Sequence, residues 1–177
     1  MLGDAGLDIK GARITVLGVA YKGGVDDARA SPAEYIVREL LNRGAKVVVY
    51  DPYITESFGA ERSFSLEDAV KEADVVVIVT DHPEFKNMDL DKISELVRRR
   101  IIVDGKRVIE PHQAVKHGFK FYVLAMARRL NCKYMFIIMR SKPGIIKIAK
   151  MFEDVSRAVN IQMLLRFKSE EVSRIEY

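Results

Sequence analysis

The amino-acid sequence predicts an α/β fold: an open, mostly parallel sheet with helices on both faces, followed by a C-terminal βαβ-like extension. Short β-branched runs alternate along the chain with segments whose apolar residues recur at helical spacing. The run 75–79 is apolar at every position, as in strands that are buried on both faces of a parallel sheet. Strand–helix–strand units of this kind are joined by right-handed crossovers and place their strands in parallel.

The first expected helix has clear signals at both ends. Ser31 suits the N-cap and Pro32 the first helical position, while Glu34 is placed to reach back and close a capping box. Gly44 is typical of a helix C-terminus. A second helix is expected to begin at Ser65, and a third spans 89–99. The expected strands are 13–18, 46–50, 74–80, 101–104 and 119–124.

Three segments are therefore expected: a lead-in over residues 1–12, a Rossmann-like domain over 11–129, and a basic β-α-β extension over 130–177. The extension is expected to hold strands at 133–139 and 161–167 and a helix at 143–159. It either adds to the core or mediates self-association through its apolar face.

Charge and apolar content restrict the class of protein. Residues 131–177 hold 9 lysines and arginines and 5 aspartates and glutamates, which accounts for the whole net charge of +4. The balanced charge before them argues against a nucleic-acid partner. The apolar runs at 75–79 and 134–139 are far shorter than the about 20 residues that span a membrane. With no signal peptide at the N-terminus, a cytoplasmic protein without a membrane partner is expected.

The single cysteine, Cys132, excludes an intrachain disulfide and a cysteine-rich metal site. We expect no metal in this chain. Cys132 is interpreted as an ordinary small thiol rather than a nucleophile.

Residues 18–32 follow the first strand and form the loop best suited to hold a ligand. Ligands of open α/β sheets bind beyond the carboxyl ends of the strands. This loop leads into a capped helix N-terminus, whose N–H groups and dipole favour anions. Lys22 and Arg29 add cationic donors, and Tyr21 adds a ring that can stack on a base. These are the parts that a nucleotide diphosphate requires.

Two structural readings compete with this one. Gly23 and Gly24 can simply permit a turn. Asp26 and Asp27 can pair with Lys22 or Arg29 in a salt-bridge cluster.

A dinucleotide site is a third alternative with weaker support. The glycines at 18, 23 and 24 do not have the G-x-G-x-x-G spacing. Asp51 stands where an NAD-binding fold holds the ribose, but the sequence Asp-Pro favours a strand terminator.

The same loop carries a resemblance to a known family. Residues 16–22, followed by 26–33, closely resemble the opening of the C-terminal domain of the UDP-glucose/GDP-mannose dehydrogenase family. Further similar segments follow in the family's order, at residues 49–53, 65–69, 73–85 and 102–105. The residues at 81–82 and 104–105 resemble most the UDP-N-acetylmannosamine branch of this family.

The resemblance implies that separate domains of the complete enzyme have separate functions. In this family an N-terminal Rossmann domain binds NAD, a helical middle segment dimerises, and the C-terminal domain grips the UDP part of the sugar nucleotide. The complete enzyme oxidises the sugar 6-hydroxyl to a carboxylate through a catalytic cysteine. Carried over, the resemblance assigns UDP-sugar binding to Tyr21, Lys22 and Arg29, and places Lys106 where the family has an arginine.

Several positions depart from the family pattern. Ala30 replaces a glutamate, and residues 124–129 lack the glycines of the family's last turn. Neither an NAD domain nor the segment around the catalytic cysteine is recognisable, so the resemblance implies no catalytic residue and no cofactor in this chain. NAD and the cysteine would come from a separate partner chain. The alternatives are a non-catalytic fragment, a self-associating nucleotide-binding module, and a stand-alone NAD-binding Rossmann protein.

Overall fold

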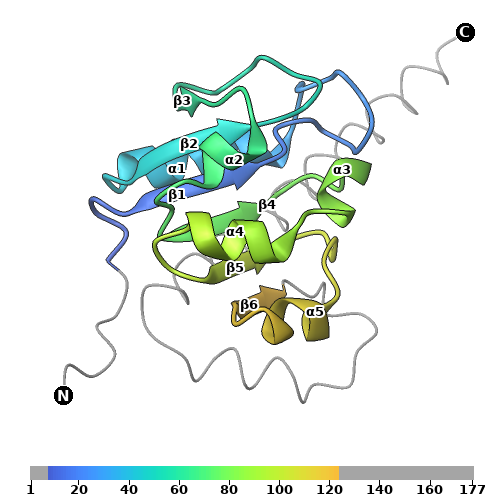
Figure 1. Ribbon diagram of the computed structural model, residues 1–177. Helices are drawn as coiled ribbons and strands as arrows, with labels where there is room; N and C mark the ends of the chain where they lie inside the picture. Colours follow the sequence, from blue (N-terminus) through green and yellow to red (C-terminus); the bar gives the residue numbers. More distant parts are fainter. Residues whose placement is uncertain (1–7, 124–177) are drawn as a thin grey trace, which may run out of the picture.

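The computed structural model describes residues 8–123, which form a six-stranded parallel sheet with the order β3-β2-β1-β4-β5-β6 (Figure 1). The strands are β1 (Arg13–Leu17), β2 (Lys46–Tyr50), β3 (Glu61–Arg62), β4 (Val75–Ile78), β5 (Ile101–Asp104) and β6 (Lys120–Val123). The predicted α/β class and parallel sheet are confirmed. β2 and β5 match their expected bounds, while β1, β4 and β6 are shorter at one or both ends.

Helices cover both faces of the sheet, but unequally. They are α1 (Pro32–Asn42), α2 (Leu66–Val70), α3 (Pro83–Lys86), α4 (Leu90–Leu96) and α5 (Pro111–Lys116). In Figure 1, α2, α4 and α5 lie in front of the sheet and α1 lies behind it. The sequence reading omitted β3, α3 and α5, each of which is at most six residues long. Such short elements show too few apolar repeats to reveal a period.

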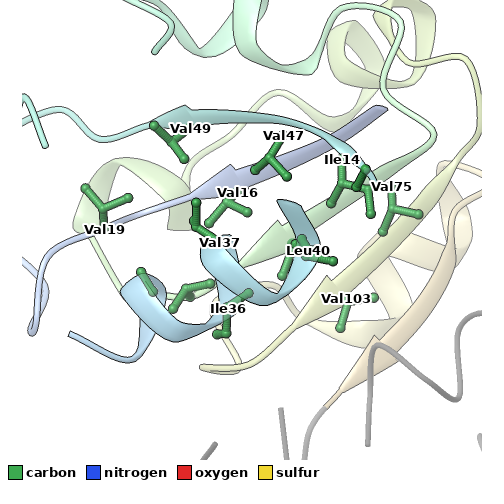
Figure 2. Close-up of a cluster of buried hydrophobic side chains, with 14 of the residues drawn as sticks. Ile14, Val16, Val19, Ile36, Val37, Leu40, Val47, Val49, Val75 and Val103 are labelled. Carbon is green, nitrogen blue, oxygen red and sulfur yellow. The ribbon is translucent and has the colours of Figure 1, made fainter. Parts of the chain in front are cut away.

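Each face of the sheet packs its own apolar core. On the α1 side, Ile36, Val37 and Leu40 of the helix pack against the valines and isoleucines of the strands (Figure 2). On the other side, α2, α3, α4 and α5 bury residues such as Phe85 and Ile93 against the alternate strand positions. The side chains of Val75, Val76, Val77 and Ile78 are all buried because β4 lies between the two cores.

The N-terminus of α1 confirms one capping prediction and corrects another. The Ser31 hydroxyl accepts a hydrogen bond from the Ala33 N–H at 3.2 Å, as expected for an N-cap. Glu34 does not close a capping box, since the Ser31 N–H donates to the Ala28 carbonyl at 3.1 Å. The Glu34 carboxylate instead pairs with Arg38 at 2.9 Å, one helical turn onward. The Arg38 guanidinium, four residues away on the same helix face, competes with the Ser31 N–H for the Glu34 carboxylate.

The expected extension at residues 130–177 lies outside the described residues, as do Cys132 and the proposed boundary at residue 129. None of the helices within residues 8–123 is long and apolar enough to cross a membrane.

Close approach between β1 and β4 depends on Gly18. Its φ is +86°, and a Cβ built there would lie 2.4 Å from the Thr80 Cβ and 2.9 Å from the Thr80 backbone nitrogen. Both atoms belong to the segment that follows β4, so the two strand ends can meet only where no side chain separates them.

We therefore predict that Gly18→Ala destabilises the domain more than Gly11→Ala. Both glycines have positive φ, but a Cβ at Gly11 would meet nothing within 4 Å. The control carries only the backbone cost, about 1–2 kcal/mol, while Gly18→Ala adds the clash and should cost about 3–5 kcal/mol. Unfolding in denaturant measures both variants, and equal losses would show that the strand ends separate freely.

Candidate functional site

The loops at the carboxyl ends of β1, β2, β4 and β5 form the candidate site. The switch point of the sheet lies between β1 and β4, because the chain leaves β1 for α1 on one face and β4 for α3 and α4 on the other. Ligands of open α/β sheets bind at such a point. In this structure the loop of residues 18–31 crosses from β1 to the segment after β4.

Asp51, directly after β2, organises this edge of the sheet. Its residue is only 6% exposed, and its two carboxylate oxygens accept five hydrogen bonds. One oxygen accepts from Val19 N at 2.8 Å, Ala20 N at 3.0 Å and His82 Nε2 at 2.9 Å; the other accepts from Tyr53 N at 2.9 Å and Ile54 N at 3.1 Å. Asp51 thus ends β2 as the sequence favoured, and neither oxygen remains for a ribose.

These hydrogen bonds decide the charge of Asp51. Burial disfavours the ionised carboxylate, but the hydrogen bonds from His82 and from the N–H groups of Tyr53, Val19 and Ala20 outweigh it and lower the pKa of Asp51 to about 2. The side chain is therefore an anion at neutral pH, held by donors from three loops.

The turn after β5 is also held by a buried aspartate that accepts hydrogen bonds from backbone N–H groups. The fully buried carboxylate of Asp104 accepts from the backbone nitrogens of Lys106 at 2.9 Å, Val108 at 2.7 Å and Ile109 at 2.9 Å. Lys106 is fixed through its backbone while its side chain is exposed.

Gly23 and Gly24 bring the first loop against the segment after β4. Gly23 N donates to Asp81 Oδ1 at 3.2 Å, and Gly24 N donates to His82 Nδ1 at 3.1 Å. A Cβ at Gly23 would lie 2.3 Å from the Asp81 carbonyl oxygen, and Gly24 has a φ of +74°. The structural reading of this glycine pair is confirmed, with close approach as well as a turn as its purpose.

The salt-bridge reading is confirmed for one of the predicted pairs. Arg29 meets Asp27 in a fork, with Nε at 3.0 Å from Oδ1 and Nη2 at 2.8 Å from Oδ2. The hydrogen bond from Arg29 lowers the pKa of the Asp27 carboxyl to about 2. The Arg29 side chain is 91% exposed, so an incoming anion reaches it but competes with Asp27.

The N-terminus of α1 offers an anion less than the sequence suggested. Pro32 has no N–H, Ala33 N donates to the Ser31 hydroxyl, and Glu34 N donates to the Ser31 carbonyl at 3.2 Å. The helix dipole remains favourable, but the hydrogen bonds to an anion must come from side chains.

The four predicted site residues do not line one pocket. Tyr21, Lys22, Arg29 and Lys106 are all exposed at this end of the sheet, Tyr21 to 37%. A shallow hollow of about 680 Å³ lies beside α1 and includes Arg29 but none of the other three. Its lining is Ala28, Arg29, Glu34, Arg38, Glu56, Phe58 and Gly59. Two arginines and two glutamates give this hollow a mixed charge.

Sequence reasoning missed the residues that hold the site together. Asp51 and His82 are 31 positions apart, and nothing in the sequence pairs them. The only signal was that both fall directly beyond predicted strands, where loops of a parallel sheet converge. Within residues 8–123, no group of three histidine, cysteine or acidic side chains is arranged to hold a metal ion.

Comparison with known proteins agrees with this architecture. Residues 15–111 match the model of the UDP-glucose/GDP-mannose dehydrogenase family, UDP binding domain. The UDP-N-acetyl-D-mannosamine dehydrogenase of Methanocaldococcus jannaschii is 40% identical over 115 residues, covering 63% of this chain and 26% of that protein. The UDP-glucose 6-dehydrogenase of Rickettsia bellii is 37% identical over 124 residues, covering 66% and 29%.

A solved structure shows the same fold. The UDP-D-MAnNAc dehydrogenase from Pyrococcus horikoshii superposes with a TM-score of 0.57 at 42% identity, covering 66% of this chain and 26% of that one. The chain therefore spans about a quarter of the length of the proteins it matches.

We predict that Asp51→Asn destabilises the domain by about 2–4 kcal/mol at neutral pH. Each carboxylate oxygen accepts from backbone N–H groups, so in either orientation the new amide NH2 faces N–H donors in a buried place. Glu95→Gln, at an exposed position, makes the same chemical change and should cost less than about 0.5 kcal/mol. A loss at Asp51 no larger than the control would remove this carboxylate from its central role.

The pH dependence of this difference follows from the Asp51 pKa. Because the folded pKa is lowered from 3.8 to about 2, the stability contributed by the ionised carboxylate is fully present above the unfolded value. It is lost as the pH falls through about 2. Denaturant unfolding of the wild type and Asp51→Asn should give a constant difference above about pH 5 that narrows by about 2 kcal/mol on acidification. A difference unchanged between pH 5 and pH 2 would contradict this.

Proposed function

We propose, because the chain belongs to the UDP-glucose/GDP-mannose dehydrogenase family and carries its UDP-binding domain over residues 15–111, that it binds a UDP-sugar at the carboxyl ends of β1, β4 and β5. The observation that carries the proposal is the loop of residues 18–31, which is tied down at the switch point of the sheet while its cationic side chains face solvent. A fixed backbone with exposed cations is the arrangement that an anionic ligand requires.

Each candidate residue has a role in this proposal. Lys22 and Lys106 supply ammonium groups to the phosphates from the two sides of β4, and neither takes part in an ion pair within the described residues. Arg29 adds a guanidinium that is kept in place by Asp27 until the anion arrives. The ring of Tyr21 stacks on the base. No residue of this chain is assigned a catalytic role.

The described residues do not fit NAD. The glycines at 18, 23 and 24 bring loops together rather than opening a space for a pyrophosphate, and both oxygens of Asp51 are occupied by protein donors. We assign NAD, and the oxidation of the sugar hydroxyl to a carboxylate, to domains supplied outside residues 8–123. A separate chain that carries them is the partner we propose.

We predict that the protein binds UDP and UDP-N-acetylmannosamine, does not bind NAD, and loses UDP affinity in the Lys22→Ala, Arg29→Ala double variant. Hydrogen bonds to charged groups contribute about 1.5–3 kcal/mol each, part of which Arg29 already gains from Asp27. We therefore expect the dissociation constant for UDP to be about 10- to 100-fold larger in the double variant than in the wild type. Calorimetric titration at low salt measures it.

A matched control is the Lys46→Ala, Lys120→Ala double variant. It removes the same two charges from exposed positions at the amino ends of β2 and β6, the opposite edge of the sheet. It should bind UDP as the wild type does. Equal losses in the two double variants would mean that only net charge matters, and binding of NAD without UDP would favour the stand-alone NAD-binding alternative.

A further inference from the structure

His82 is the one histidine among the described residues whose side chain is completely buried. It lies between β4 and α3, with the Tyr53 ring 5.0 Å and the Phe85 ring 5.4 Å from its own, measured between centroids. Both ring nitrogens have partners, and those partners come from two other loops of the site. A buried, fully paired imidazole at this place has no part in the proposed contacts with the ligand.

The partners determine the tautomer of the ring. Gly24 N–H donates to Nδ1 at 3.1 Å, so Nδ1 carries a lone pair and the proton of the neutral ring is on Nε2. Nε2–H then donates to Asp51 Oδ2 at 2.9 Å. The imidazole is thereby oriented by Gly24 N–H, which can only donate, and by the Asp51 carboxylate, which can only accept.

These bonds fix both ends of a short segment of the loop. Asp51 Oδ2 accepts from Val19 N and Ala20 N at the start of the segment, and the His82 ring accepts from Gly24 N at its end. Tyr21 and Lys22 stand between the two anchors. One carboxylate, extended by one imidazole, therefore spans the part of the loop that carries two of the proposed ligand contacts.

We propose that His82 is a positioning residue for nucleotide binding: through Nδ1 it holds the 19–24 segment in the conformation that presents Lys22 to the phosphates of the ligand. This inference rests on the proposed UDP-sugar site and adds a residue to it that does not touch the ligand. An anchored loop has less conformational freedom to lose on binding, which favours affinity.

The two nitrogens of His82 have separable effects. Gly24 is exposed, so its N–H can turn to water at little cost in stability when Nδ1 is removed. Asp51 is buried, so removal of the Nε2 donor leaves a buried anion with one fewer partner and costs stability. Nδ1 therefore governs the position of the loop, and Nε2 governs the stability of the domain.

Two amide variants separate these effects. In His82→Asn the side-chain oxygen lies near the position of Nδ1 and keeps the Gly24 bond, but the shorter side chain does not reach Asp51. In His82→Gln the longer side chain carries its NH2 to the position of Nε2 and keeps the Asp51 bond, but leaves Gly24 N–H without its acceptor. We expect the Gln variant to bind UDP about 5- to 10-fold more weakly with a melting temperature near that of the wild type. The Asn variant should melt earlier but keep its UDP affinity within about 2-fold.

The order of the two variants decides the proposal. If UDP affinity follows thermal stability, so that the Asn variant is worse in both, His82 is merely a structural residue and the proposal is overturned. If the wild type does not bind UDP at all, the UDP-binding proposal fails, and His82 is then judged from the protein without ligand.

A second measurement, nitrogen NMR of the labelled wild-type protein without ligand, tests the hydrogen bond between Gly24 N–H and His82 Nδ1 directly. It does not depend on any variant folding. We expect the His82 resonances of the neutral Nε2–H tautomer and a Gly24 amide that exchanges at least 10-fold more slowly than the amide of its exposed neighbour Val25. A protonated Nδ1, or a Gly24 amide as fast as Val25, would show that the anchor is absent and would overturn the proposal.

Discussion

The buried carboxylate of Asp51 is the interaction on which the arrangement of this domain's site depends. Removing an ionised carboxylate from water is costly, and here the cost is offset by five hydrogen bonds from the segments after β1, β2 and β4. No single loop provides enough donors. The three loops must therefore be in place together, and folding of the sheet assembles this edge as a unit.

This arrangement determines which groups remain for a ligand. Asp51 and Asp104 use their oxygens on the backbone of the loops that follow their strands, while Ser31 occupies the N–H of Ala33 at the start of α1. The backbone is thus largely satisfied by the protein itself, and under the proposed function the hydrogen bonds to an anion come from the exposed side chains of Lys22, Lys106 and Arg29. Fold families that bind dinucleotides do the reverse, using the backbone of a glycine-rich turn.

Under the proposed function, this arrangement suits a domain that holds the nucleotide part of the ligand. The chain covers about a quarter of the dehydrogenases that it matches, and within residues 8–123 the buried side chains of Asp51, His82 and Asp104 hold loops through hydrogen bonds. A hydride acceptor and a nucleophile must meet the sugar from elsewhere under the proposed function. The contribution of this domain is then orientation: a nucleotide held at a rigid edge presents its sugar in one direction.

Much of the fold could be predicted because its determinants are local. Apolar runs and helical spacing are periodic in the sequence, so β2, β5, α1 and their order follow from short windows. Ser31, Ser65 and Gly44 act on neighbours within four residues, and their predicted places at the helix ends agree with the structure. The resemblance at residues 16–33 located the loop that the comparisons then assigned to a UDP-binding domain.

What the sequence determined by itself was therefore the alternation of strands and helices, the parallel sheet and the candidate loop. The tertiary structure decided the rest. It turned Glu34 toward Arg38 instead of the backbone, committed Arg29 to Asp27, and brought Asp51 and His82 together across 31 residues. Hydrogen bonds between loops depend on how the strands are ordered in space. A linear pattern of residue types records each partner but not their distance, so such a bond becomes visible only once the sheet is assembled.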